Sequence, residues 1–402
     1  MRHPYRPRTI LRRLTIRFAL AGLPMALCLA DPAPGVSPDL ARDIQAIRAV
    51  GSEGRGNVEA TAALRRLAAL GGEALPGLLA GMDGAGPLAA NWLRGAVETI
   101  ADREPAGGTN STVPALGRFL LETRNDARAR ALAFELLSRA DPATADKLLA
   151  GMLNDPSPDL RHGAVRKLVE QAAQTLAGGN KAGARVLLGQ ALASARQAAQ
   201  IDAIATQLRD LGEPVDLPAT FGFLMRWHVI GPFDSTGGAG FAHAYPPEER
   251  LDSNAQYDGK LGPVKWRDYT TTNEHGAIDM NQPFTPLKAA AAYAWTEFFS
   301  EADQDVELRL ASENAWKLWL NGGLVFGQNE YHLQKAIDQY VMNVRLRRGP
   351  NTILVKVCQN EQTEDWAGGW DFHLRICDRT GATIRAAAPP AAAAAGPSAG
   401  SP

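Results

Sequence analysis

Between Trp316 and Cys377 the chain alternates apolar and polar residues with a period of two, a pattern that few folds accept. β-Branched and aromatic residues dominate the apolar positions, which is typical of strands with one buried face. The rows that share one side are Trp316, Leu318 and Leu320, then Met342, Val344 and Leu346, then Ile353, Val355 and Val357, and last Phe372, Leu374 and Ile376. The stretch therefore predicts an antiparallel sheet that forms half of a sandwich.

Two short segments of this stretch predict tight reversals. Asn321-Gly322 is a hairpin dipeptide, because a primed turn needs positive φ at its centre. The segment Arg348–Asn351 contains Gly and Pro and predicts a second reversal. Parity also separates two tryptophans, since Trp316 lies on the inward side and Trp319 on the other. We expect Trp316 in the core and Trp319 outside it, in contact with an element that docks on the second face.

The chain before about Gly212 has another composition, rich in Ala, Leu and Arg. Trp92 is its only tryptophan, while the other seven lie between Trp227 and Trp370. Apolar residues recur there with a helical period in short segments that end at Gly, Pro or Asp. The predicted helices span Pro38–Val50, Val58–Leu70, Leu88–Ala101, Val113–Glu122, Ala127–Arg139, Ala143–Leu153, Asp159–Leu176, Ala182–Ala195 and Ala198–Leu211. The shift in composition predicts a boundary between a helical domain and a β domain.

Two of these helices begin with similar sequences. The segment at Asp126–Ala131 aligns with Asp159–Ala164 at a separation of 161 − 128 = 33 residues. A helical pair that repeats at this period favours an α-solenoid, because each pair buries its apolar face against its neighbours. The segment Asp155–Arg161, with Ala164 and Leu168 beyond it, resembles a HEAT-type repeat. An irregular α-helical bundle is the alternative.

The β-rich region resembles the galactose-binding-like jelly roll. The resemblance rests on Trp-Leu-Asn-Gly at Trp319–Gly322 and on L-x-x-G-x-N-T-I-L-V-K-V at Leu346–Val357. A W-x-x-x-G-P-F segment at Trp227–Phe233 and Tyr-Pro-Pro-Glu at Tyr245–Glu248 are similar to the entry of this module in secreted HEAT-repeat proteins. The fold class implied is α + β multidomain, with an α-solenoid of HEAT-like repeats followed by an antiparallel β-sandwich of jelly-roll type.

The resemblance implies binding rather than catalysis. This jelly roll forms the sugar-binding domain of family 2 glycoside hydrolases, which keep their catalytic carboxylates in a separate barrel domain, and no such domain fits in this chain. The sequence contains no H-E-x-x-H, G-x-S-x-G or P-loop motif. His162, His228 and His373 are scattered singly, with sheet packing or a solvated position as their ordinary role. We therefore expect no enzyme activity and no cofactor.

The segment Ser312–Ala315 is the position at which a calcium site would be expected. Protective-antigen-type lectin domains carry Asp-Asp-Gly before a comparable strand, and Ca²⁺ needs several oxygen ligands. The sequence reads Ser-Glu-Asn-Ala here, so one carboxylate and the Gly are missing. We expect no metal. The charge balance also argues against nucleic acid as a partner, because Lys+Arg 42 against Asp+Glu 43 leaves a formal charge of −1.

The N-terminus predicts an export signal. Several arginines between Arg2 and Arg17 precede an apolar run, Phe18–Ala30, that ends in a small residue. The run is too short for a stable membrane span, which needs about 20 apolar residues. Export by the Sec route is favoured, with the twin-arginine route left open by Arg12-Arg13. The expected location is periplasmic or extracellular.

Two cysteines, Cys358 and Cys377, follow the export signal. They fall on the polar side of their strands, so a disulfide is conceivable in an oxidising compartment. A symmetric hairpin near Asp365 would instead place Cys358 opposite Phe372, which favours two unpaired thiols.

The expected domain limits follow from these patterns. They are a signal peptide at 1–30, a HEAT-like helical domain at 38–213, a linker at 214–220, the galactose-binding-like sandwich at 221–380 and a disordered Ala/Pro-rich tail at 381–402.

Successive antiparallel strands return to opposite ends, so alternate loops meet at one end of the predicted sandwich. That end collects aromatic rings and hydrogen-bonding groups, which are what a sugar needs. The candidate ligand-binding residues are Glu313, Asn314, Asn329, Glu330, Tyr331, His332, Asn360, Asp365 and Trp366, with Glu364 beside them. The alternative is that Tyr331 and Trp366 only cover the sandwich core.

The sequence thus favours a secreted, non-enzymatic binding protein. Its solenoid would offer a surface to a protein partner, and its sandwich would bind a glycan or a cell-surface polysaccharide. The first alternative is a structural protein–protein interaction module without sugar binding. The last is an accessory domain of a glycoside-hydrolase system.

Overall fold

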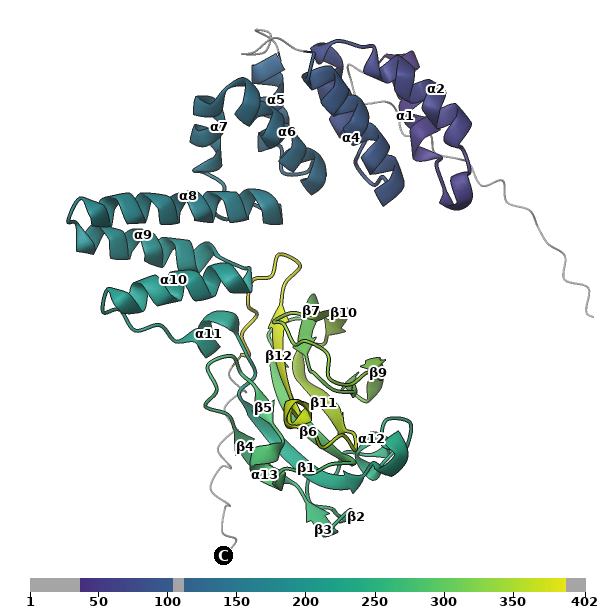
Figure 1. The fold of residues 1–402 in the computed structure, drawn as a ribbon, viewed down its shortest axis with the longest axis vertical. Coiled ribbons are helices and arrows are strands. Elements are labelled where there is room, and N and C mark those ends of the chain that lie inside the picture. The colour runs from purple at the N-terminus through teal and green to yellow at the C-terminus, as the bar shows by residue number, and fades with distance from the viewer. Residues whose placement is uncertain (1–36, 104–111, 388–402) are drawn as a thin grey trace, which may run out of the picture.

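The computed structural model describes residues 37–103 and 112–387 of this chain. Helices occupy the first half of the described chain and antiparallel strands the second (Figure 1). The expected export signal at 1–30 and the tail after residue 387 lie outside the described residues. None of the helices in the described ranges is long and apolar enough to span a bilayer.

The helical part contains all the predicted helices and two more. Its helices are α1 (Pro38–Arg48), α2 (Asn57–Ala68), α3 (Leu75–Ala80), α4 (Pro87–Ala101), α5 (Thr112–Leu121), α6 (Ala127–Ala140), α7 (Pro142–Leu149), α8 (Pro158–Ala177), α9 (Lys181–Ser194), α10 (Ala198–Asp210) and α11 (Leu217–Phe221). The short helices α3 and α11 were not predicted.

The starts of these helices have local causes. Proline stands at the first helical position of α1, α4, α7 and α8, where the missing N–H is no loss. Asp126 caps α6, because its carboxylate accepts hydrogen bonds from the backbone N–H groups of Arg128 and Ala129. Asn180 caps α9 in the same way through Gly183. Such signals are readable from sequence, which explains why the predicted boundaries lie close to the observed ones.

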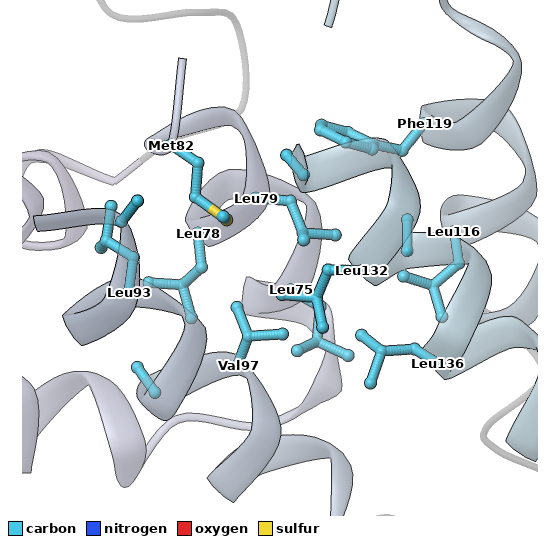
Figure 2. Packing of buried hydrophobic residues seen from close by; sticks show 14 of the residues in the cluster. Leu75, Leu78, Leu79, Met82, Leu93, Val97, Leu116, Phe119, Leu132 and Leu136 are labelled. Carbon is cyan, nitrogen blue, oxygen red and sulfur yellow. The ribbon is translucent and has the colours of Figure 1, made fainter. Parts of the chain in front are cut away.

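The helix α3 is central to packing although it is short. Its Leu75, Leu78 and Leu79 are fully buried between neighbouring helices (Figure 2). They belong to one apolar cluster with Val97 of α4 and Leu132 of α6. Burial of these leucines stabilises the stack by about 1.5 to 3 kcal/mol each. The cluster therefore joins the helices on both sides of residues 104–111 into one core.

Two buried arginines mark equivalent positions in α6 and α8. Arg130 is the fourth residue of α6 and 1% exposed, and Arg161 is the fourth residue of α8 and 4% exposed. Their separation is 161 − 130 = 31 residues, whereas the sequence alignment paired Arg161 with Arg128 at 33. The sequence alignment matched the Arg-Ala pattern and so paired Arg161 with Arg128. Arg130 is the structural equivalent of Arg161, because both are buried, whereas Arg128 lies on the exposed side of α6.

The β part contains two facing antiparallel sheets. The six-stranded sheet has the order β4–β1–β6–β11–β8–β9, and the four-stranded sheet has the order β10–β7–β12–β5. The strands are β1 (Arg226–Asp234), β4 (Arg267–Thr270), β5 (Ile278–Asp279), β6 (Ala290–Ser300), β7 (Gln304–Ala311), β8 (Trp316–Leu320), β9 (Gly323–Gln328), β10 (Tyr340–Leu346), β11 (Gly349–Gln359) and β12 (Asp371–Cys377). The core between them contains Trp227, Trp316, Trp370 and Phe372.

The sheet assignment from sequence was wrong in one respect. The stretch Trp316–Cys377 does not form one sheet, because β10 and β12 belong to the four-stranded sheet while β8, β9 and β11 belong to the other. Cys358 therefore pairs with Ala291 and not with Phe372, and Cys377 pairs with Glu307. Both cysteines are buried free thiols. Alternation identifies the inward side of a strand but leaves open which sheet it joins.

The turn predictions are confirmed. Asn321 and Gly322 have φ values of 52° and 81° between β8 and β9. Gly349 has φ 93° where the chain passes from β10 to β11. Asn351 stabilises the turn between these two strands, since its side-chain amide donates to the carbonyl oxygen of Arg347 at 2.7 Å.

The outer face of the six-stranded sheet is also partly buried. The helix α12 (Pro246–Glu249) and the hairpin of β2 (Gln256–Gly259) and β3 (Gly262–Lys265) belong to the segment over this face. Trp319 lies there, 7% exposed, in a cluster with Phe233 and Tyr245. The expected docking contact is present, but Trp319 is buried almost as deeply as Trp316, so the expectation that it lies outside a core was wrong.

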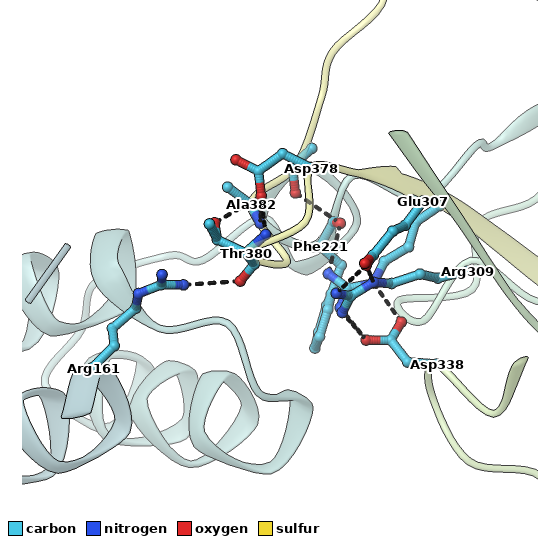
Figure 3. Close-up of polar contacts among 10 residues, drawn as sticks. Arg161, Phe221, Glu307, Arg309, Asp338, Asp378, Thr380 and Ala382 are labelled. Atoms are coloured by element: carbon cyan, nitrogen blue, oxygen red, sulfur yellow. Dashed lines mark hydrogen bonds and ion pairs between the residues drawn. The ribbon is translucent and has the colours of Figure 1, made fainter. Parts of the chain in front are cut away.

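The chain crosses between the two parts at α11 and returns after β12. Leu217 and Phe221 of α11 are buried in a cluster with helices α8 to α10, so part of the linker expected at 214–220 is helical and packed. The segment after β12 contacts both parts, since Arg161 donates to the carbonyl oxygen of Thr380 at 2.8 Å (Figure 3). Thr383 pairs with Cys377. Residues 381–387 of the expected tail are therefore placed by specific contacts.

Candidate functional site

Three loops meet at one end of the β part, as the sequence predicted. They are the β7–β8 loop at 312–315, the β9–β10 loop at 329–339 and the β11–β12 loop at 360–370. Asn314 connects them, because its amide donates to the Gly369 carbonyl at 2.6 Å and its carbonyl oxygen accepts from the His332 backbone N–H at 3.3 Å. Asn314 is only 2% exposed. It therefore positions the loops and does not face solvent as a ligand-binding group.

The aromatic residues of this loop end have different surroundings. The Trp366 ring is 63% exposed and stands edge-on to the His332 ring, with 5.0 Å between centroids. His332 Nε2 lies 3.1 Å from Asn360 Oδ1, which fixes the imidazole. Tyr331 instead packs on the outer-face cluster, and burial raises the pKa of its hydroxyl. The structure thus supports a core contact for Tyr331 and leaves Trp366 open.

The other predicted residues of the loop end divide by exposure. Asn329, Glu330 and Asp365 are exposed. Glu313 is half-buried beside Gly369, where a side chain on that glycine would collide with its carboxylate at 2.4 Å. No group of three or more His, Cys, Asp or Glu side chains in the described ranges could hold a metal ion. The loop end therefore offers a ring and several hydrogen-bonding groups on an open surface.

A second surface, which sequence reasoning missed, lies on the outer face of the six-stranded sheet. Cross-strand pairing puts His228 of β1 between Asp268 of β4 and Trp295 of β6. His228 Nδ1 lies 2.6 Å from Asp268 Oδ1, and the His228 and Trp295 rings stack with centroids 4.4 Å apart. Trp266 packs edge-on against Trp295 at 6.4 Å. These contacts fix the half-buried Trp295 ring in one orientation.

His228, Asp268 and Trp295 border a groove of about 820 Å³. Its walls include His228, Trp295 and Asp268, together with Arg226 and Glu297. Aromatic surface with a few polar groups in a concavity of this size is typical of small-molecule sites. We call this surface the sheet-face groove. Strand alternation in the sequence could have placed His228 and Trp295 on the outward side of their strands. Only the strand register, however, brings these residues together, because they lie far apart in the chain.

The other end of this face is closed and stabilised by buried polar groups. Lys356 is fully buried and donates hydrogen bonds to the Glu248 carboxylate and to the His243 carbonyl, both at 2.6 Å. Burial lowers the pKa of Lys356, and the Glu248 contact opposes this. Burial also raises the pKa of the nearby Cys358 thiol to about 12, so this thiol stays protonated at neutral pH. This end of the face is core rather than a site.

The chain was compared with known proteins. No family model matches it, and no curated protein matches it. Among solved structures it is similar to a beta-glucosidase from Kluyveromyces marxianus in complex with glucose, with 13% identity and a TM-score of 0.23, over 37% of this chain and 16% of that chain. It is also similar to a GH31 alpha-xylosidase from Xanthomonas citri, with 11% identity and a TM-score of 0.21, over 39% of this chain and 18% of that chain. The chain thus spans less than a fifth of either enzyme, and similarity at this level transfers no activity.

Proposed function

We propose that this chain is a non-enzymatic binding protein whose β part recognises carbohydrate. In this proposal residues 38–213 form an α-solenoid of HEAT-like repeats, and residues 221–380 form a galactose-binding-like jelly roll joined to it at 214–220. The equivalent buried arginines of α6 and α8 support the repeat, and the two facing antiparallel sheets support the jelly roll. In the same proposal the export signal expected at 1–30 directs the protein to the periplasm or outside the cell, where polysaccharides are found.

The observation that carries the sugar proposal is the aromatic wall of the sheet-face groove. A sugar packs the C–H face of its ring on an aromatic surface while its hydroxyls form hydrogen bonds outward. Trp295 and His228 supply rings, and Asp268, Glu297 and Arg226 supply acceptors and donors along the same groove. The half-buried rings need little ordering when a ligand binds, which lowers the entropic cost.

The loop end around Trp366 is the second surface of this proposal. Its exposed ring lies beside His332 and Asn360, which are connected by a hydrogen bond. The Trp366 ring is exposed, so one ring and a few hydrogen bonds would give about 4 to 6 kcal/mol of binding free energy. We therefore place the main contact in the groove and a weaker contact at the loop end.

The test is a titration of the full chain with neutral oligosaccharides of glucose, xylose, mannose and galactose by isothermal calorimetry. We expect at least one series to bind, with a dissociation constant of roughly 1 mM to tens of μM at the loop end and a lower one in the groove. Trp295→Ala should weaken binding on the order of tenfold or more, and Trp366→Ala should weaken it less. The recovered sugars should be uncleaved if the protein is non-enzymatic as proposed.

Leu324→Ala is the matched control. Leu324 is 58% exposed and belongs to the same cross-strand row as Trp295, through Leu354 and Trp319, at the opposite edge of the sheet. Its loss should leave sugar affinity unchanged. The proposal fails if no series binds, or if binding survives both tryptophan substitutions. Cleaved products would overturn the non-enzymatic part alone.

The alternative is a structural module that binds protein through its helices. The observation that favours it is exposed apolar surface on the helical part, with Val58 80% exposed and Val186 61% exposed. Single exposed apolar residues are common, however, and these two lie on different helices, α2 and α9. Protein capture by the helical part, without sugar binding, would favour this alternative.

A further inference from the structure

A separate cavity lies where the helical and β parts meet. It has a volume of about 380 Å³ and is bordered by the end of α9, by α11, by β12 and by the segment after β12. Three arginines, Arg196, Arg375 and Arg385, line it, and none of its lining residues is acidic. We call it the arginine cavity. It shares no residue with the walls of the sheet-face groove.

The three arginines differ in how their charge is balanced. Arg375 is 1% exposed and paired with Asp338, whose Oδ1 accepts from its Nε at 2.7 Å. Arg196 donates only to the carbonyl oxygens of Ala193 and Ala195, both at 2.8 Å, and forms no ion pair within the described ranges. Arg385 is exposed, and its contact in the same ranges is the Ala219 carbonyl at 3.5 Å. Two guanidinium charges are therefore not balanced by a direct carboxylate contact.

The surroundings make this positive charge costly. Burial lowers the pKa of Arg196, and repulsion from Arg375 lowers it further, while Asp378 opposes both. Burial and repulsion from Arg196 likewise lower the pKa of Arg161, which donates to the Thr380 carbonyl nearby. Asp378 is itself occupied by hydrogen bonds from Thr380 and Ala382. An anion in the cavity would relieve repulsion that the protein's own carboxylates only partly offset.

We propose that the arginine cavity binds the oxyanion group of a small molecule, namely a carboxylate, sulfate or phosphate. The planar guanidinium fork matches such groups, because two parallel N–H donors meet two oxygens. The cavity is at the lower end of the size range of ligand sites and exceeds the space of a bare ion. It can therefore hold an acidic group together with a small body such as one sugar ring. Because its walls come from both parts, the ligand would connect them.

Thermal unfolding and calorimetry of the full chain test this proposal. The probes are sodium phosphate, sodium sulfate and sodium glucuronate, each compared with sodium chloride at equal ionic strength, with neutral glucose as a further comparison. We expect at least one oxyanion to raise the melting temperature above the chloride reference, and by more than any rise that neutral glucose gives through the sheet-face groove. The oxyanion with the largest rise distinguishes a tetrahedral inorganic group from a sugar carboxylate.

The variants are Arg196→Gln and Arg385→Gln, and each should weaken the affinity on the order of tenfold. Arg385 is exposed, so its variant keeps the test valid even if Arg196→Gln fails to fold. Arg250→Gln removes an exposed arginine of the β part that does not line the cavity, and this variant should bind like the wild type. The proposal is overturned if no oxyanion exceeds chloride, if both cavity variants bind like the wild type, or if Arg250→Gln loses affinity equally.

Discussion

Lys356 Nζ and Glu248 Oε1 are 2.6 Å apart, although 108 residues separate them in the chain. The Lys356 side chain is 0% exposed and that of Glu248 is 11% exposed. The hydroxyl of Tyr293 also donates to Glu248, at 2.5 Å. Glu248 ends Tyr-Pro-Pro-Glu and Lys356 belongs to Asn-Thr-Ile-Leu-Val-Lys-Val, two of the segments that carried the resemblance to a sugar-binding module. The contact between these two segments is structural.

Lys356→Met should destabilise the protein by about 3 to 5 kcal/mol, because it leaves the Glu248 carboxylate buried without its cation. Chemical denaturation measures this loss. The double variant Lys356→Met/Glu248→Gln should recover part of it, since no unpaired charge remains. A single variant as stable as the wild type would show that Glu248 reaches water.

The paired arginine of the helical part allows a comparison between buried and exposed ion pairs. Arg130 and Asp155 are 1% and 5% exposed and share two hydrogen bonds of 2.7 and 2.6 Å. Arg130→Met should cost about 3 to 5 kcal/mol in unfolding free energy. Arg94→Met breaks pairs with Glu98 and Glu135 in which every side chain is more than 40% exposed, and should cost less than about 1 kcal/mol. Similar losses for the two variants would contradict this account.

Gly322→Val should cost about 1 to 2 kcal/mol through backbone strain, because Gly322 has φ 81°. No atom lies within 4 Å of the position of an added Cβ, so a clash does not contribute. Thermal unfolding provides the measurement. Gly323→Val is the control, since Gly323 is exposed and lacks a positive φ, and an equal loss there would refute the strain explanation.

His373 should make stability depend on pH. Burial lowers its pKa from 6.5 to about 4, and the charge of Lys335 adds to this shift. Arg375 and His275 act in the same direction, while Asp338 opposes them. Below pH 6.5 the unfolded chain therefore takes up a proton that the folded chain refuses, and stability falls until about pH 4. The loss is about 3 kcal/mol at most, since one pKa unit corresponds to ~1.4 kcal/mol.

His373→Gln removes this titration. Unfolding free energies of wild type and variant at several pH values between 4 and 7 give the difference that belongs to His373. The wild type should lose more stability than the variant as the pH falls. Parallel curves would mean that the pKa of His373 is the same in the folded and the unfolded chain.

The sequence predicted local structure better than long-range pairing. Asp126 and the prolines that begin α1, α4, α7 and α8 are local signals, so the helices were located closely. The helix α3 was missed because its six residues are too few for a periodic pattern. Strand alternation placed Trp316 inward, yet it gave no information on which sheet β10 or β12 joins.

The candidate sites show the same division. The meeting of Asn314, His332 and Trp366 was predictable, because chain reversal alone brings alternate loops to one end. The sheet-face groove was not, since Asp268, His228 and Trp295 come together only through the register of three strands. The arginine cavity was not predictable either, because it forms where α9 and α11 pack on the segment after β12, and no local sequence pattern encodes that packing.

The return of the chain from β12 to α8 has a mechanical consequence. If α11 were the single connection, the helical part could rotate relative to the β part. The second attachment, at Thr380 and Arg161, lies apart from the first in the sequence and acts as another point of fixation. Torque applied to the helices is therefore transmitted to the sheets. Under a twisting or pulling load, the two parts should move together as one rigid body.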